Sequence, residues 1–200
     1  MAQSGQSIDA PIKGERIVWR TTGEETGGAT VIFDQFIKPG GGYTGDHIHI
    51  LQDERNEVVS GVATYSIDGV KKTARVGERI DIPHKTIHQN PYNAPDATEE
   101  LHLLREITPE MGIEIFFETT YGLARDGKVD KEGNVNPFQM AVLGNDLHNK
   151  TYFFPKLVPY WIQNIFVPFV AFIGHLLGMR ARYEKYSGPE PTVPGKSENI

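Results

Sequence analysis

The sequence predicts an all-β barrel of two sheets that is extended at its C-terminus by α-helices. Short β-rich runs with glycine- and proline-containing turns between them fill residues 16–107, a pattern typical of sandwiches and barrels. The runs read RIVWRTT, ATVIFDQFI, EVVSGVATYSID, RIDIP, IHQN and ELHLLREI. After Ile107 the apolar residues recur at helical spacing instead. We therefore expect a flexible N-terminus (1–14), a barrel (15–108), a helical extension (109–186) and a disordered tail (187–200).

One tight hairpin is predicted inside the barrel region. Asp68 and Gly69 separate the run YSI from VKKTARV. Glycine accepts the positive φ that two-residue hairpin turns require. We expect the two runs to pair as antiparallel neighbours.

Two helices are predicted in the extension. Thr108, Pro109 and Glu110 read as an N-cap, a proline at the first helical position and an acidic first turn. A strand through GIEIFFETT is the rival interpretation, because apolar residues also alternate there. We favour the helix on its cap and its length. Asn136 and Pro137 open a second helix, to about residue 147, by the same capping logic.

Composition restricts the classes of function. The 200 residues, 38% apolar and 10% aromatic, suffice for one domain with a core, or one domain plus an appendage. A net charge of −6 provides no basic stripe, so we expect no nucleic-acid partner. The chain has no cysteine, which excludes disulfides and thiolate ligands. The first thirty residues lack the apolar run of a secretory signal, and we expect a cytoplasmic protein.

The segment GGYTGDHIHILQDERNEVVSG, which starts at Gly41, carries metal-ligand side chains. His47 and His49 are two residues apart, so a strand projects both from one face. Imidazole nitrogen binds Fe, Mn, Ni, Cu or Zn, and the carboxylate of Glu54 adds an oxygen donor. His88, in GERIDIPHKTIHQN, is a fourth candidate. The spacing predicts a site for one divalent transition metal.

The order of these residues resembles the cupin superfamily. Its first motif, G-x5-H-x-H-x3-4-E-x6-G, is met without a gap from Gly41 to Gly61. Its second, G-x5-P-x-G-x2-H-x3-N, is met at Gly77, Pro83 and His88, whereas Lys85 stands where glycine is usual and the final asparagine is displaced. The resemblance covers residues 15–108. It implies a double-stranded β-helix, or jelly roll, with one metal at its centre bound by His47, His49, Glu54 and His88.

Two alternatives accompany this ligand set. Gln52 and Asp53 are neighbouring oxygen donors that could replace Glu54, but Glu54 alone keeps six residues to Gly61. The other alternative is a degenerate site, in which these residues serve only the folding of the barrel and bind no metal.

The function expected from the resemblance is a metal-dependent transformation of a small organic molecule. With Fe or Mn, which we favour, four protein ligands leave two octahedral positions open, and dioxygenase chemistry is the first expectation. A non-catalytic binding module and a non-redox isomerase or cyclase are the alternatives. Candidates for substrate binding are His84, Lys85, His102 and Arg105. His102 and Arg105 lie on opposite faces of one strand, so only one of them is expected to face the interior.

Residues 157–179, LVPYWIQNIFVPFVAFIGHLLGM, carry no formal charge apart from any on His175. About 20 apolar residues span a bilayer, but Gln163 and Asn164 are costly in lipid and two prolines interrupt the run. A wide apolar face would suit a helix clamped on the barrel or buried in a homodimer, which we favour, or one in contact with a membrane. The residues of that face are Trp161, Ile165, Phe169, Phe172 and Leu176, with Ile162, Phe166, Ile173 and Leu177 offset from them. Arg180 and Arg182 would suit its C-terminal end or anionic headgroups.

Overall fold

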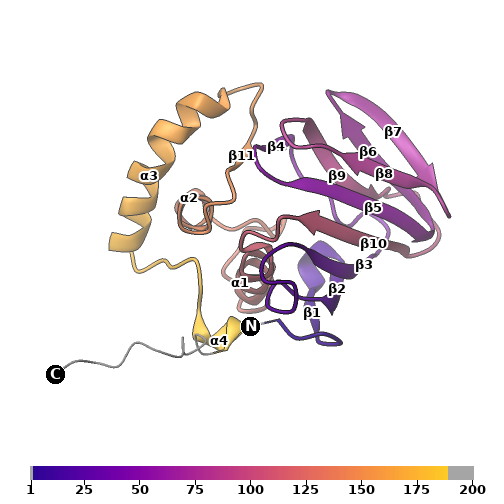
Figure 1. The fold of residues 1–200 in the computed structure, drawn as a ribbon, viewed down its shortest axis with the longest axis horizontal. Coiled ribbons are helices and arrows are strands. Elements are labelled where there is room, and N and C mark those ends of the chain that lie inside the picture. The colour runs from indigo at the N-terminus through magenta and orange to yellow at the C-terminus, as the bar shows by residue number, and fades with distance from the viewer. Residues whose placement is uncertain (1, 189–200) are drawn as a thin grey trace.

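Two antiparallel sheets face each other to form the predicted barrel, and the helices lie along one side of it (Figure 1). The computed structural model describes residues 2–188. In strand order, the six-stranded sheet contains β1 (Ser7–Ala10), β2 (Glu15–Thr21), β3 (Val31–Ile37), β10 (Leu101–Thr108), β5 (Asp53–Ser60) and β8 (Arg79–Ile82). The five-stranded sheet contains β11 (Thr151–Phe153), β4 (His47–His49), β9 (Ile87–Asn93), β6 (Val62–Ile67) and β7 (Val70–Arg75).

Alternation along β5 and β10 determines which side chains reach the interior. In β5, Glu54, Asn56 and Val58 are buried, and the residues between them are exposed. Residues paired directly across two strands project from the same face. Asn56 pairs with Arg105, and Arg105 pairs with Phe33, so this row of side chains shares the inner face.

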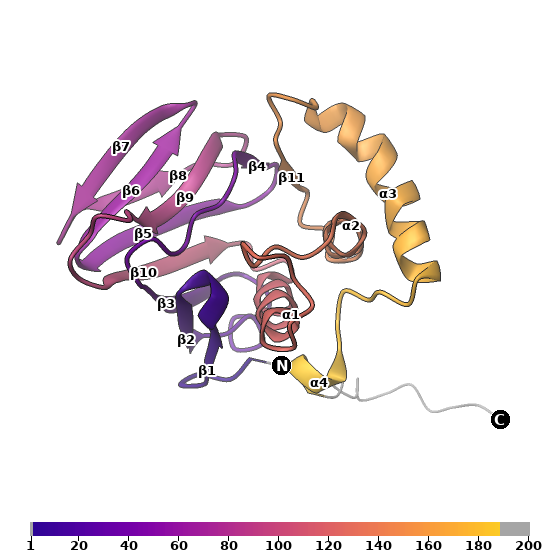
Figure 2. The same ribbon diagram turned by 180° about the vertical axis from the view of Figure 1, so that it is seen from behind.

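Two apolar clusters cover the inner face of the six-stranded sheet. At the β1–β3 end, Trp19 and Phe33 pack against Phe117 of α1 (Ile113–Arg125), with ring centroids 6.3 and 5.5 Å from that of Phe117. Figure 2 shows α1 beside this end of the sheet. Toward the other end, a second cluster that includes Val58 and Leu103 packs beneath the five-stranded sheet. The sheet is therefore shared between the barrel and α1.

The predicted hairpin is confirmed, and regular secondary structure extends into the N-terminal segment 1–14 that we expected to be flexible. Asp68 and Gly69 join β6 to β7 with φ of 52° and 84°, so both central residues are left-handed. At the N-terminus, β1 pairs with β2, and a 3₁₀ turn, η1 (Pro11–Lys13), connects them. Ile8 and Ala10 are buried in the cluster under α1. Their burial offsets the ordering cost of a segment that looks small and polar in sequence.

The helical interpretation of the extension is confirmed, with one correction at the first cap. Thr108 ends β10 and donates its hydroxyl hydrogen to Thr30 Oγ1, so it does not cap α1. The Glu110 carboxylate accepts from the backbone N–H of Glu114 and Gly112 instead. In α2 (Pro137–Asp146), the Asn136 side chain caps as predicted.

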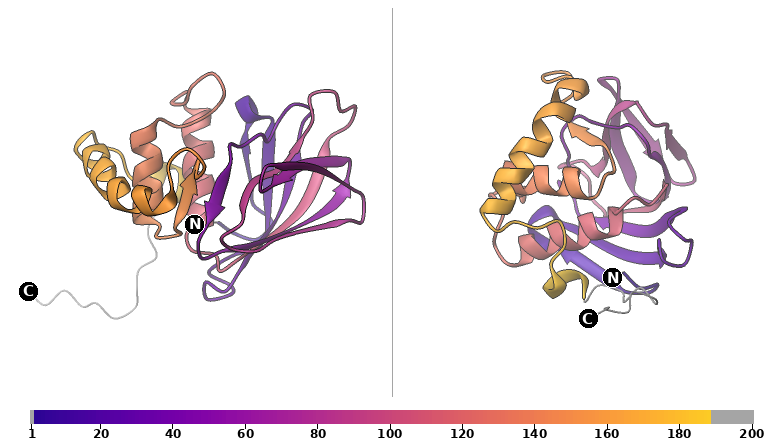
Figure 3. Two further views of the ribbon diagram at one scale, coloured as in Figure 1. Left: turned by 90° about the horizontal axis from the view of Figure 1, so that it is seen from above. Right: turned by 60° about the vertical axis from the view of Figure 1, so that its left-hand side comes forward.

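The apolar segment forms α3 (Tyr160–Leu176), which lies on α2 rather than on the barrel, and the alternative of a homodimer interface stays a prediction. The helix packs on α2 through small residues: Ala171 is buried, and a Cβ on Gly174 would meet Val142 at 2.7 Å. Small residues allow close approach only on that side, and the large side chains point away from it. Figures 1 and 3 show α2 between α3 and the barrel.

The end of the extension returns toward α1. α4 (Glu184–Ser187) places the Tyr186 ring against Gly122 of α1.

No helix within residues 2–188 combines the length and the apolarity needed to cross a membrane. The predicted disordered tail falls largely on residues 189–200, outside the described residues.

Candidate metal centre

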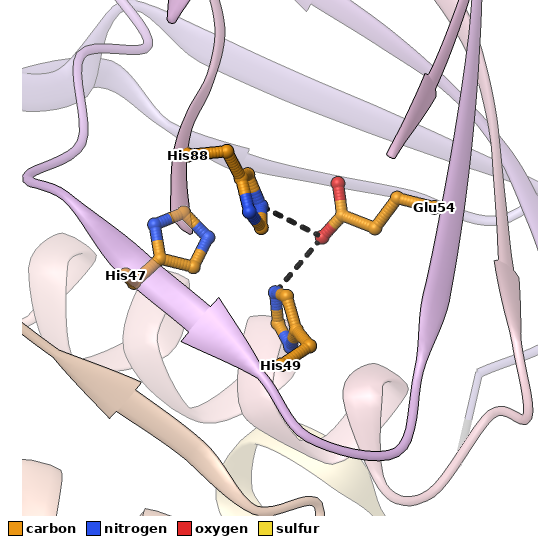
Figure 4. A group of neighbouring side chains, drawn as sticks. All are labelled: His47, His49, Glu54 and His88. Carbon is orange, nitrogen blue, oxygen red and sulfur yellow. Dashed lines mark ion pairs between the residues drawn. The ribbon is translucent and has the colours of Figure 1, made fainter. Parts of the chain in front are cut away.

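The four predicted ligands meet between the two sheets. His47 and His49 come from β4, and His47 pairs directly with His88 of β9 in the same sheet. Glu54 comes from β5 of the facing sheet, and its carboxylate approaches the imidazoles from the opposite side (Figure 4). One ligand atom from each of these four residues lies within 4.8 Å of all the others. All four side chains are buried, so the group could hold a metal ion away from solvent.

Each imidazole is oriented by a contact at its Nδ1 atom. His47 Nδ1 lies 3.0 Å from Gly45 O, and His88 Nδ1 lies 2.9 Å from Thr86 O. A carbonyl oxygen only accepts, so these Nδ1 atoms carry hydrogen and each Nε2 keeps a lone pair. His49 Nδ1 lies 2.8 Å from Thr151 Oγ1. Metal-binding histidines in proteins are held in this way.

The protonation states suit a cation. Burial, followed by the neighbouring imidazoles, lowers the pKa of His47 well below its usual value, and burial also lowers the pKa of His88. Burial alone would raise the pKa of Glu54, but the Arg105 guanidinium and His49 outweigh it and hold that pKa well below the usual range. At neutral pH His47 and His88 are therefore neutral imidazoles, and Glu54 is a carboxylate.

Two atomic positions test whether a metal fits the cluster. His88 Nε2 is buried and has no hydrogen-bond partner among the described residues, because Glu54 Oε1 lies 4.0 Å away. His49 Nε2 lies 3.0 Å from the same oxygen. A buried nitrogen without a partner is costly unless it binds something. The donor set of imidazole and carboxylate therefore fits a divalent transition metal.

Arg105 connects the carboxylate to the rest of the interior. Its Nη2 donates to Glu54 Oε2 at 2.8 Å, and its Nη1 donates to Gln35 Oε1 at 2.7 Å. Asn90 Oδ1 lies 3.3 Å from Nη2. Both partners of the ion pair are buried, so the guanidinium fixes one carboxylate oxygen while the other faces the imidazoles.

The helical extension reaches this site through β11. That strand pairs with β4, so Thr151 lies opposite His49 and Phe153 lies opposite His47. The Phe153 ring stacks on the His47 ring, with centroids 5.6 Å apart. Two of the candidate ligands are thus supported by a segment outside the predicted barrel.

Comparison with known proteins finds similar solved structures. No protein-family model matches the chain, and no curated protein matches it. A cupin-like protein of Thermotoga maritima is 24% identical with a TM-score of 0.41, and the match covers 48% of this chain and 68% of that one. An RmlC-like cupin from Shewanella frigidimarina is 16% identical at 0.43, over 52% and 84%. A predicted oxalate decarboxylase from Thermotoga maritima is 15% identical at 0.44, over 55% and 89%.

The strand pairing and the order of the site residues decide the kind of barrel. Two antiparallel sheets face each other, and the side chains at the motif positions meet between them. The barrel has the cupin fold. The glycine position of its second motif is occupied by Lys85 with φ of 64°, which explains why glycine is usual there. The Lys85 N–H donates to His49 O, so the cupin turn forms despite the departure.

The substrate-binding candidates divide between the two sides of the cupin barrel. Arg105 faces the interior beside Glu54. His102 faces outward, where its Nε2 lies 2.7 Å from Asp34 Oδ1 and its ring stacks on Phe36. His84 and Lys85 are exposed. The structure thus brings only Arg105 of these four candidates into the interior, as expected for one member of the His102/Arg105 pair, and substrate binding by the other three stays a prediction.

The rival oxygen donors differ in position. Asp53 points outward, and its Oδ1 accepts from the backbone N–H of His84 at 2.7 Å, on the surface. Gln52 precedes β5 and is buried like Glu54, but its amide nitrogen donates to Pro109 O and Glu110 O, both at 2.9 Å. Of the three, only Glu54 has a carboxylate oxygen that lies among the imidazoles.

Four side chains near the candidate ligands and Arg105 were not predicted from the sequence: Gln35, Asn56, Asn90 and Thr151. Asn56 lies two residues after Glu54 on the same strand, so alternation alone could have placed it inside. Thr151 carries no such signal, because its contact with His49 spans 102 residues of sequence.

Proposed function

We propose that this cupin is a metal-dependent enzyme that acts on a small organic molecule, with dioxygenase-type oxidation as its reaction. The observation that carries the proposal is the convergence of four buried ligand atoms within 4.8 Å. His47, His49, Glu54 and His88 would hold one divalent metal. Bound there, Fe or Mn would supply Lewis acidity and redox chemistry with dioxygen, with two octahedral positions left for substrate atoms.

Arg105 acts in this proposal as a positioning residue for Glu54. Its guanidinium holds Oε2, so the orientation of the carboxylate is set before any ligand binds. It also keeps Glu54 ionised, since its charge lowers the pKa of that carboxyl. The pair leaves little net charge inside the barrel beyond that of a bound metal.

Asn56 is our candidate for contact with the substrate. It lies across the sheet from Arg105 and is fully buried, and neither its Oδ1 nor its Nδ2 has a hydrogen-bond partner among the described residues. A buried amide without partners costs free energy, which a polar ligand would recover. The amide both donates and accepts, so it suits a substrate with hydroxyl, carbonyl or carboxyl oxygens.

Metal analysis tests the first half of the proposal. Protein purified without added metal should carry about one Fe or Mn per chain by elemental analysis, and alanine at any of the four ligands should lower that content sharply. His84→Ala is the matched control, because His84 is an exposed histidine that contacts Asp53 instead. Full metal content in a His47→Ala, His49→Ala double variant would overturn the ligand assignment.

An oxygen-consumption screen tests the second half. Oxygenated aromatic and aliphatic compounds should include one whose turnover consumes dioxygen stoichiometrically. Asn56→Ala should raise the KM of that reaction and leave metal content unchanged. Asn93→Ala is the structural control, because the Asn93 amide donates to the backbone at Ile37 O and Glu99 O. Turnover that continues anaerobically would assign an isomerase or cyclase reaction instead. A saturable ligand-induced spectral shift with no turnover would assign a binding module.

A further inference from the structure

The outward side of α3 and the loop before it form an apolar surface without a partner in the structure. We define this outer α3 face as Phe154, Leu157, Val158, Tyr160, Trp161, Ile165, Phe166, Phe169, Phe172, Leu176 and Leu177, all of which are exposed. Large hydrophobic residues exposed elsewhere, such as Val59 and Val70, are scattered over the barrel strands. Figures 1 and 3 show α3 at the outer edge of the molecule. Contiguous exposed apolar surface of this kind marks an interaction site.

The polar side chains of α3 bond to the protein and so leave the outer face apolar. Gln163 donates to Phe153 O and Val158 O. Asn164 Oδ1 accepts from the Tyr152 hydroxyl at 2.7 Å, and His175 Nε2 lies 3.3 Å from Asp146. These groups therefore need no water on the outer side of the helix.

The packing of α3 holds it along the protein rather than away from it. Ala171 and Gly174 lie against α2, and a Cβ on Gly174 would also meet Phe138 O at 3.0 Å. At the other end, Gln163 and Asn164 bond to the segment that carries β11. These contacts hold α3 at both ends, so its outer side stays turned away from the rest of the protein.

Charge distinguishes between the partners that an apolar strip could meet. Residues 147–188 contain five basic side chains and one acidic one, although the whole chain carries a net charge of −6. The basic residues lie beyond the two ends of α3, with Lys150 and Lys156 before it and Arg180, Arg182 and Lys185 after it. Lys156 pairs with Asp46 and Lys185 pairs with Asp126. No carboxylate partner is recorded for Lys150 or Arg180 within the described residues.

We propose that the outer α3 face inserts into the surface of an anionic membrane, with the helix parallel to the bilayer plane. Aromatic and aliphatic side chains would enter the headgroup boundary, and the basic ends would meet the lipid phosphates and carboxylates. A second copy of the chain fits less well. Pairing two such strips would place basic ends against basic ends, whether the helices run parallel or antiparallel.

Vesicle binding by the full-length protein tests this proposal. We expect sedimentation with vesicles of phosphatidylcholine and phosphatidylserine, and much weaker binding to phosphatidylcholine alone. Phe169→Ser with Phe172→Ser should lower the partition coefficient more than tenfold, because two exposed aromatic anchors are lost. Val59→Ser with Val70→Ser is the control, since it removes exposed apolar side chains from the barrel. Lys150→Gln and Arg180→Gln should each weaken binding to the anionic vesicles about fivefold.

Tryptophan fluorescence locates the inserted surface directly. The chain has two tryptophans: Trp161 is 60% exposed, and Trp19 is fully buried. Lipids brominated in the acyl chain should quench the emission of the wild-type protein. The same lipids should not quench the emission of the Trp161→Phe variant, which should still bind vesicles but retains only the buried Trp19.

Three results would overturn the proposal. The first is wild-type protein that does not sediment with anionic vesicles, and the second is a Phe169→Ser, Phe172→Ser variant that binds as tightly as wild type. The third is a wild-type dimer, measured by sedimentation equilibrium without lipid, that the same variant converts to monomer while vesicle binding is absent. That outcome would assign the outer α3 face to self-association. None of these readouts depends on the metal site.

Discussion

Thr151 Oγ1 lies 2.8 Å from His49 Nδ1, so a residue of the C-terminal extension supports a candidate metal ligand of the barrel. The contact exists because β11 pairs with β4 and places Thr151 opposite His49. The helical extension is therefore part of the site, although it lies outside both cupin motifs.

Thr151→Val should lower metal affinity about 10- to 100-fold, because the isosteric change leaves His49 Nδ1 without its partner. Thr151→Ser keeps the hydroxyl and should retain most of the affinity. Competition with a chromophoric chelator measures both. An unchanged affinity in Thr151→Val would show that β4 alone orients the imidazole.

Arg105→Met should destabilise the metal-free protein by about 3 kcal/mol, because Glu54 would remain buried without its cation. Burial would then raise the pKa of Glu54 above that of the unfolded chain, so the loss should grow as pH rises from 5 to 8. Urea denaturation at both pH values measures it. Adding Glu54→Gln should restore much of the stability, and failure to do so would mean that Arg105 acts mainly through Gln35 or Asn90.

Glu114→Gln should stabilise the protein at pH 8 by on the order of 1–2 kcal/mol and change little at pH 4. Burial raises the pKa of Glu114 from 4.5 to about 7. Between these values the unfolded chain releases the proton and the folded protein keeps it, so stability from this group falls as pH rises and is lost above about 7. The amide oxygen of glutamine can still accept from Gly23 N–H. Denaturation midpoints across this pH range test the prediction, and a gain of equal size at both ends would contradict it.

Lys85→Gly should raise the free energy of unfolding by about 1 kcal/mol, because Lys85 has φ of 64° and glycine adopts that conformation without steric cost. Lys85→Ala is the control, since alanine keeps the strain. Metal content should be the same in both variants, because the contact of Lys85 near the site is made by its backbone. Urea denaturation measures the gain, and an equal gain in the alanine variant would contradict the role of φ.

Much of the site could be predicted from the sequence because strands impose a strict alternation. His47 and His49 must share a face, and alternation along β5 turns Glu54 inward and its neighbour Asp53 outward. The turn at Asp68 and Gly69 could be predicted because both residue types tolerate the positive φ that a two-residue hairpin requires. These are local constraints, and they hold whatever surrounds them.

Other features were decided by contacts between distant segments. Alternation predicts that His102 and Arg105 face opposite ways, but only pairing with Glu54 and Asp34 shows that Arg105 is the inner one. Ile8 and Ala10 of β1 are buried under α1, in a segment that looks flexible in sequence.

The same division applies to α3. Its periodicity determined that a helix with a wide apolar face would form, because side chains at helical spacing share a side. The side of α3 that is covered depends on shape complementarity with α2. The small residues Ala171 and Gly174 allow the close contact there, and the aromatic side chains remain outside. The sequence by itself thus determined the candidate ligand set, the hairpin and the helices. Tertiary packing decided which surfaces they bury and brought Thr151 to His49, since those contacts join residues that no local spacing relates.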